Sequence, residues 1–180
     1  MKVRTGFVSN SSSSSFLLWL PKKPENIEET KEVFNIKQKR LDAYANFYLD
    51  AKQLQRDLED AGITLDDVVR RLYEKLNEQS ELTIDELKNR VQYGMLSTLA
   101  DYILELIRGD EAERSREELY KDIMKHAEKI AKAMLANAKT ENKYLIHVQF
   151  SDHDPVESIL MYNYNFLFMY VQYLLLEGRA

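Results

Sequence analysis

Hydrophobic residues in the middle of the chain recur every three to four positions, and polar residues mark where these repeats begin and end. The motifs Thr64–Asp67 and Thr83–Glu86 have the Thr-x-x-acidic spacing of a capping box, in which each side chain bonds the backbone N–H of the other residue. The two motifs predict helices over 64–78 and 83–108, and Gly109 provides a stop signal for the second.

Three flanking segments also show helical spacing of their apolar residues. A short helix is predicted over Pro24–Phe34. A helix predicted over 37–62 ends at Gly62, and its inner face carries Leu41, Tyr44, Phe47, Tyr48 and Leu54. A helix predicted over 115–138 begins at the capping residue Ser115, and its inner face carries Leu119, Ile123, Ala127, Ile130 and Met134.

Two other segments suit β-strands. Phe16–Leu20 is short, bulky and stopped by Pro21. The segment 143–150 alternates, so that one side carries Tyr144, Ile146, Val148 and Phe150 and the other carries His147 and Gln149. Because an isolated strand pair is marginally stable, the two strands need burial under helices or a third strand, for which Val3–Val8 is the candidate.

The last segment begins with the helix-start signals Asp154 and Pro155 and is then apolar on nearly every side from Ile159 to Leu176. This pattern predicts one central buried helix, and a dimer interface is the second interpretation. Polar residues interrupt the apolar run and argue against a transmembrane span, namely Asn163, Asn165 and Gln172.

Composition indicates a single domain over 1–180, since 44% of its 180 residues are hydrophobic and 31% are charged. We expect a predominantly helical α+β fold, in which the N-terminal segment and residues 143–150 form a small sheet. Its parts are a Ser-rich strand segment over 1–20, a helical body over 24–140 and a strand-loop-helix unit over 143–177.

The chain has no cysteine, which excludes disulfides, thiol nucleophiles and Cys-ligated zinc and favours a reducing cytoplasm. No long apolar stretch follows the first basic residues, so a secretory signal is not expected. The net charge of −5 argues against broad nucleic-acid binding. A small anion site near Lys2, Arg4, Lys22 and Lys23 remains open.

The cluster with metal-ligand character lies where the strand over 143–150 meets the final helix. His147, Asp152 and His153 could together hold a divalent metal that activates a water. Competing interpretations are a turn role for Asp152 and a capping role for the neighbouring Asp154. Neither a His-Glu-x-x-His motif, a Gly-x-Ser-x-Gly elbow nor a phosphate-binding P-loop occurs in the chain.

The serine run between Phe7 and Phe16 has several interpretations: a flexible spacer, a local turn packed by the two phenylalanines, close packing against another backbone, a phosphorylation site, or a recognition element. In a recognition element the N–H groups of successive serines face an anion or the carbonyls of a partner. The binding residues would then be Asn10, Ser11, Ser12, Ser13, Ser14, Ser15 and Trp19.

Arg4, the segment Gly6–Ser15 and Phe16 follow the pattern Arg-x-Gly-Phe-Val-Ser-Asn, then serines, then Phe. This stretch resembles an N-terminal signature of short proteins of tailed bacteriophages and bacterial genomes that mostly have no assigned function. The resemblance implies a viral or mobile-element origin, and it carries no catalytic residues with it.

We therefore expect a phage-type accessory protein in the host cytosol, without enzymatic activity or a cofactor. It would bind a host or viral protein through its Ser-rich N-terminal segment and its aromatic C-terminal helix. One alternative is a metal-dependent hydrolase centred on His147, Asp152 and His153. Another is an oligomerising structural subunit whose final helix packs against itself.

Overall fold

The structure is a computed structural model that describes residues 13–93 and 116–178. Its elements confirm a predominantly helical α+β fold with a small antiparallel sheet. In chain order they are β1 (Ser13–Leu20), α1 (Ile27–Phe34), α2 (Gln38–Ala45), α3 (Leu49–Ala61), α4 (Leu65–Asn77), α5 (Ile84–Tyr93), α7 (Arg116–Thr140), β2 (Tyr144–Ser151), α8 (Pro155–Tyr162), α9 (Tyr164–Leu167) and β3 (Gln172–Gly178).

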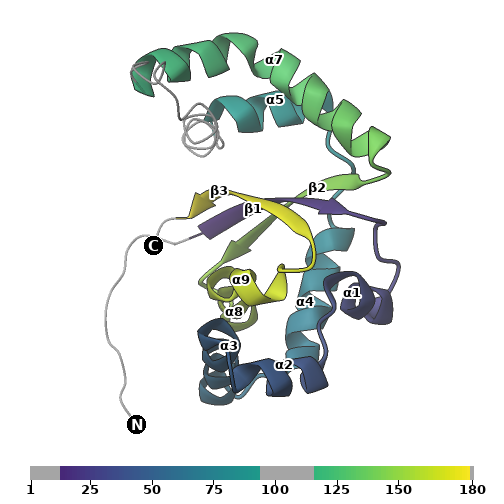
Figure 1. Ribbon diagram of the computed structural model, residues 1–180, viewed down its shortest axis with the longest axis vertical. Coiled ribbons are helices and arrows are strands. Elements are labelled where there is room, and N and C mark those ends of the chain that lie inside the picture. The colour runs from purple at the N-terminus through teal and green to yellow at the C-terminus, as the bar shows by residue number, and fades with distance from the viewer. Residues whose placement is uncertain (1–12, 94–115, 179–180) are drawn as a thin grey trace.

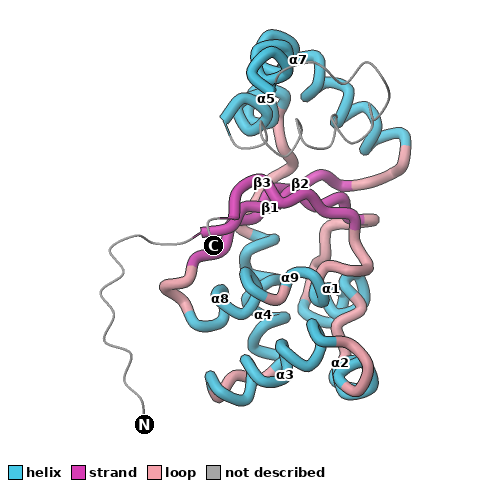
Figure 2. The backbone as a smooth tube through the Cα atoms, turned by 60° about the vertical axis from the view of Figure 1, so that its left-hand side comes forward, coloured by secondary structure: helices cyan, strands magenta, loops and turns pink. Residues whose placement is uncertain are grey.

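The sheet has the strand order β2-β1-β3, and the middle strand β1 is antiparallel to both neighbours. It lies between two helical layers, with α5 and α7 on one face and the remaining helices on the other (Figures 1 and 2). Segments from the two ends of the described chain thus lie side by side in one sheet, as the sequence predicted for β1 and β2.

The middle strand is buried on both faces, which explains its uninterrupted apolar sequence. Phe16, Leu18 and Leu20 pack into the larger core with α1–α4, α8 and α9. Leu17 and Trp19 face the other way and pack against α5 and α7. Each face of the sheet therefore closes a separate hydrophobic core.

Both capping boxes form as predicted. The Thr64 hydroxyl accepts from the Asp67 N–H at 3.2 Å, and the Asp67 carboxylate accepts from the Thr64 N–H at 2.9 Å. Thr83 and Glu86 make the same pair of bonds at 3.2 and 2.8 Å. The predicted continuation of this second helix to Gly109 lies outside the described residues.

The predicted helix 115–138 is confirmed by α7, although its cap Ser115 lies outside the described residues. Leu119, Ile123 and Ala127 of its predicted inner face are buried. The short helix predicted over Pro24–Phe34 is confirmed by α1.

The single helix predicted over 37–62 is wrong. The backbone turns at Asn46–Tyr48, where Tyr48 is extended, and α3 begins after it. Phe47 is 85% exposed, so it does not lie on an inner face. Successive residues of a helix point about 100° apart, so one helical face cannot bury three consecutive bulky side chains such as Phe47, Tyr48 and Leu49. The predicted end at Gly62 is confirmed by its left-handed φ of 66°.

The single helix predicted over Ile159–Leu176 is also wrong. Helix α8 ends before Asn163, whose side-chain amide donates to the Ile159 carbonyl at 3.1 Å and to Asp57 at 2.8 Å. After α9 the chain forms β3, with Tyr173 and Leu175 in one core and Leu174 and Leu176 in the other. A run that is apolar on all sides fits a strand buried on both faces as well as a buried helix.

Strand β3 is therefore the third strand that the sheet required. The candidate from the sequence, Val3–Val8, lies outside the described residues. No helix in the described part of the chain is long and apolar enough to cross a membrane.

Candidate functional site

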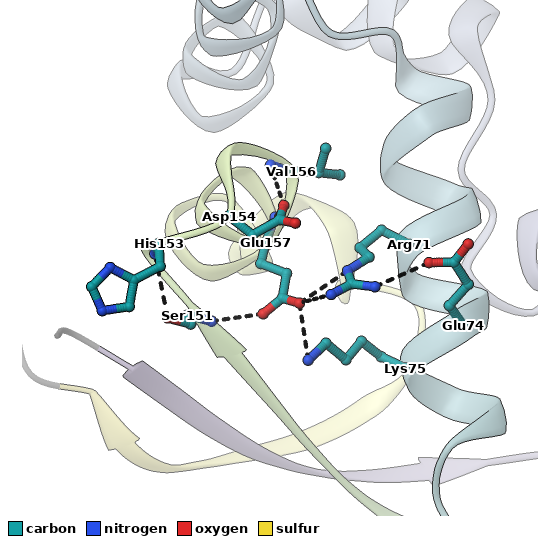
Figure 3. Close-up of polar contacts among 8 residues, drawn as sticks. All are labelled: Arg71, Glu74, Lys75, Ser151, His153, Asp154, Val156 and Glu157. Atoms are coloured by element: carbon teal, nitrogen blue, oxygen red, sulfur yellow. Dashed lines mark hydrogen bonds and ion pairs between the residues drawn. The ribbon is translucent and has the colours of Figure 1, made fainter.

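A buried carboxylate, Glu157, lies where β2, α4 and α8 meet (Figure 3). Its position depends on the helix start that the sequence predicted. The Asp154 carboxylate caps α8 by accepting from the N–H groups of Val156 at 2.8 Å and Glu157 at 3.0 Å. This cap fixes the first turn of α8, and the Glu157 side chain points from that turn toward α4.

The Glu157 carboxylate has polar partners on both oxygens. Oε1 accepts from the Arg71 guanidinium, with Nε at 2.9 Å, and from Lys75 Nζ at 2.9 Å. Oε2 accepts from the Ser151 N–H at 3.0 Å. Burial by itself would raise the pKa of Glu157, but the bonds from Lys75, Ser151 and Arg71 outweigh it and leave the pKa below its usual value. The carboxylate thus stays ionised and ties three elements together.

Next to this network is a cavity of about 330 Å³ along β2, which we call the β2 cavity. Its lining residues come from α4, the connection after it, α5, β2 and α8, and they are Lys75, Gln79, Arg90, His147, Gln149, Phe150, Ser151 and Glu157. Polar and charged groups dominate this wall, so a polar ligand would fit it better than an apolar one.

His147 is buried, with 6% of its surface exposed, and its Nε2 has no hydrogen-bond partner among the described residues. Burial and the nearby charge of Arg90 lower the pKa of His147 to about 4, and Glu86 opposes this shift only in part. The imidazole is therefore neutral at pH 7. A neutral histidine can use Nε2 as a donor or as an acceptor.

The predicted trio of His147, Asp152 and His153 does not share one cavity. Asp152 lies in a second cavity of about 650 Å³, beside Asp57 and Asp60. His153 is exposed, its backbone N–H donates to the Ser151 hydroxyl, and its ring points away from the Glu157 carboxylate (Figure 3). Within residues 13–93 and 116–178, no three His, Asp or Glu side chains are grouped to hold a metal ion.

The predicted binding residues of the N-terminal segment are described in part. Ser14, Ser15 and Trp19 are buried in β1. Ser14 and Ser15 pair with β2 on one side and with β3 on the other. Asn10, Ser11 and Ser12 lie outside the described residues, and Ser13 begins the strand. Partner binding by these residues stays a prediction, and replacing Ser14 or Ser15 would also disturb the middle of the sheet.

The exposed apolar surface of the described chain is concentrated near the turn between α2 and α3. We define the aromatic patch as Tyr44, Phe47, Tyr48, Leu49, Met169 and Tyr170. The Tyr44 ring stacks on Tyr48 with centroids 5.1 Å apart, and its hydroxyl lies 3.4 Å from that of Tyr170. These contacts join the turn to the segment just before β3.

The buried side chain of Arg40 contacts the inner side of the aromatic patch. Its guanidinium lies 4.3 Å from the Phe166 ring centroid and 4.4 Å from that of Tyr170. It also donates to the backbone carbonyls of Asn35 and Phe166. These cation–π contacts and hydrogen bonds fix the position of Arg40, and Arg40 in turn orients the rings of Phe166 and Tyr170.

The sequence contained a signal for the patch but none for the β2 cavity. Three consecutive bulky residues at 47–49 indicate that at least one of them leaves the inner face of a helix. Lys75, Arg90 and His147 belong to three separate elements, and no local pattern indicates that they meet.

Comparisons of this chain with protein-family models, curated proteins and solved structures found no match.

Proposed function

We propose that this chain is a non-enzymatic accessory protein that binds another protein through the aromatic patch. The observation that supports this proposal is the exposure of three consecutive bulky residues, with Phe47 and Leu49 each 85% exposed and Tyr48 57% exposed. Fully burying one such side chain contributes about 1.5–3 kcal/mol. A partner that buries the patch therefore gains several kilocalories per mole of favourable binding free energy from a small area.

The arrangement of the rings favours binding. Tyr44 is stacked on Tyr48, and its hydroxyl is hydrogen-bonded to that of Tyr170. The Arg40 guanidinium lies over the Tyr44 and Tyr170 rings, so the three tyrosines of the patch are fixed. A surface whose side chains are already fixed loses less conformational entropy when a partner orders it. Tyr is also enriched among the residues that dominate protein–protein binding energies.

The aromatic C-terminal segment takes part in this proposal through Met169 and Tyr170, which are 47% and 51% exposed. The segment Asn10–Ser12 is proposed as a second contact. A host or viral protein as the partner, and a phage-type origin, rest on the N-terminal resemblance. The proposed partner carries apolar side chains that cover the patch.

The test is site-specific photo-crosslinking in bacterial host cells. A photoreactive p-benzoylphenylalanine in place of Phe47 is expected to give one discrete adduct with a different protein. The matched control carries the same group in place of Met124, which is 37% exposed on α7, across the sheet from the patch. The control is expected to give no such adduct.

A binding assay with a double variant tests whether the patch itself is required. The double variant Phe47→Ser and Leu49→Ser should abolish binding of the cross-linked partner and leave the far-UV circular dichroism unchanged, because both residues are exposed. The proposal is overturned if the Phe47 adduct is absent or equals the control. An adduct with the mass of two copies also overturns it, in favour of an oligomerising structural subunit.

A further inference from the structure

The β2 cavity combines Arg90, which makes no hydrogen bond or close ion pair with another described residue, with a buried imidazole whose Nε2 has no hydrogen-bond partner in the described part of the chain, and with a carboxylate that is already fully bonded. We propose that this cavity binds a small monocarboxylate. The site shares no residue with the aromatic patch, so this proposal and the protein-binding proposal can fail independently.

Charge is the first observation that supports a monocarboxylate. The cations Lys75 and Arg90 and the anion Glu157 leave the wall with one net positive charge, on a chain whose net charge is −5. One negative charge neutralises the residues that line the cavity, and the Glu86 carboxylate on α5, which acts on Arg90 and His147 without lining the cavity, adds to the repulsion of any second negative charge. A dianion such as phosphate would bring a second negative charge beside Glu157, where like charges repel.

The availability of donors is the second observation. Glu157 is occupied by Arg71, Lys75 and the Ser151 N–H. Arg90 is half-buried and makes no hydrogen bond or ion pair with any other described residue. A guanidinium presents a fork of N–H groups that matches the two oxygens of a carboxylate. Arg90 is thus the group in this wall that can anchor the ligand.

His147 supplies the third observation. Its Nε2 is buried without a partner among the described residues, and an unpaired buried polar group destabilises the folded chain. His147 lines the cavity, but its Nε2 is closed off from solvent in the structure. The proposal therefore includes a turn of the imidazole that brings the Nε2–H tautomer to a carboxylate oxygen held by Arg90.

The edge of β2 adds main-chain donors on the cavity side. The Ser151 N–H points away from β1, since it donates to Glu157 at 3.0 Å. The pairing of β1 with β2 has no register shift, and main-chain groups alternate in direction along an antiparallel strand. The N–H groups of Gln149 and His147 therefore also point away from β1. Both residues line the cavity.

Size limits the ligand further. A cavity of about 330 Å³ is at the lower end of the roughly 300–1,000 Å³ range of small-molecule sites. The exposed amide of Gln149 offers a polar contact at the mouth of the cavity. This volume sets an upper limit on the size of the carboxylic acid and admits one as small as acetate.

The experiment is an NMR titration of the full chain with sodium acetate, with chloride added to hold the ionic strength constant. We expect saturable shifts of the Arg90 Nε–H and His147 ring signals. Arg90→Gln should weaken acetate binding roughly tenfold or more, because it removes the charged fork. The control Arg56→Gln removes an exposed arginine of α3 that does not line the cavity, and it should bind acetate like the wild type.

Inorganic phosphate provides the comparison ligand. The proposal is overturned if phosphate binds these signals more tightly than acetate, if the acetate shifts never saturate, or if Arg90→Gln binds acetate as well as the wild type does. Should Arg90→Gln fail to fold, Arg90→Lys replaces it, since it keeps the charge and removes only the fork. Weaker acetate binding by Arg90→Lys would support the proposal, and unchanged binding would overturn it.

Discussion

His147 should make the stability of this protein depend on pH in a way that one substitution removes. The residue is 6% exposed, and its pKa of about 4 lies below the ordinary value of 6.5. Burial is the main cause, and the charge of Arg90 on α5 adds to it. Glu86 on the same helix opposes the lowering of this pKa. The other charged residues that line the cavity with His147 are Lys75 and Glu157.

The direction of the change in stability with pH depends on whether the folded or the unfolded chain binds the proton more tightly. Below pH 6.5 the unfolded chain protonates His147, whereas the folded chain keeps it neutral until the pH nears 4. The free energy of unfolding therefore falls as the pH decreases through this window. A difference between 6.5 and about 4, at about 1.4 kcal/mol per pKa unit, gives a loss of about 2 kcal/mol by pH 5 and about 3 kcal/mol by pH 4.

Urea unfolding of the wild type and of His147→Gln between pH 7 and pH 4 measures this loss. Contributions of the carboxylates cancel in the difference between the two proteins, so His147 alone should account for a change of about 3 kcal/mol. His153→Gln removes an exposed histidine from the following turn and is the matched control. A wild-type minus His147→Gln difference that stays constant across this range would refute the reasoning.

Two further substitutions test the contacts that position the cavity and α4. Glu157→Gln should destabilise the fold by about 2 kcal/mol at pH 7, because the partly exposed cations Arg71 and Lys75 lose their buried counter-charge. The control Glu74→Gln removes an exposed carboxylate and should cost under about 0.5 kcal/mol. Equal urea midpoints for the two variants would contradict this prediction. Thr64→Ala should destabilise the fold by about 1 kcal/mol, because it removes the side-chain cap of α4. Thermal unfolding measures this loss, and Thr140→Ala at the exposed end of α7 is the control. A comparable loss in both variants would argue against a capping role for Thr64.

Signals confined to a few neighbouring residues were readable from the sequence. The Thr64–Asp67 box fixes the start of α4, and Gly62 ends α3, because each needs only its own backbone geometry. The alternation along β2 was also predicted correctly, since its two faces differ in polarity at His147 and Gln149.

Elements without such a contrast could not be assigned. The run Ile159–Leu176 is apolar on nearly every side, so its division into α8, α9 and β3 depends on the open edge of β1 that β3 covers. The helical spacing of the neighbours of Phe47 continues across the turn and therefore predicts that residue on the inner face, whereas the structure exposes it.

The candidate sites differ in the same way. The sequence indicates His147 as a candidate through its chemistry, but the structure does not place Asp152 or His153 in the cavity that His147 lines. The charged groups that act on His147 are Arg90 and Glu86 of α5, a helix far away in the chain, and Lys75 of α4 lines the same cavity. The sequence by itself determined the local starts, stops and two of the strands, because these depend on short-range hydrogen bonds and periodicity. Only the tertiary structure decided the third strand, the exposed patch and the cavity, because each depends on which distant surfaces bury one another.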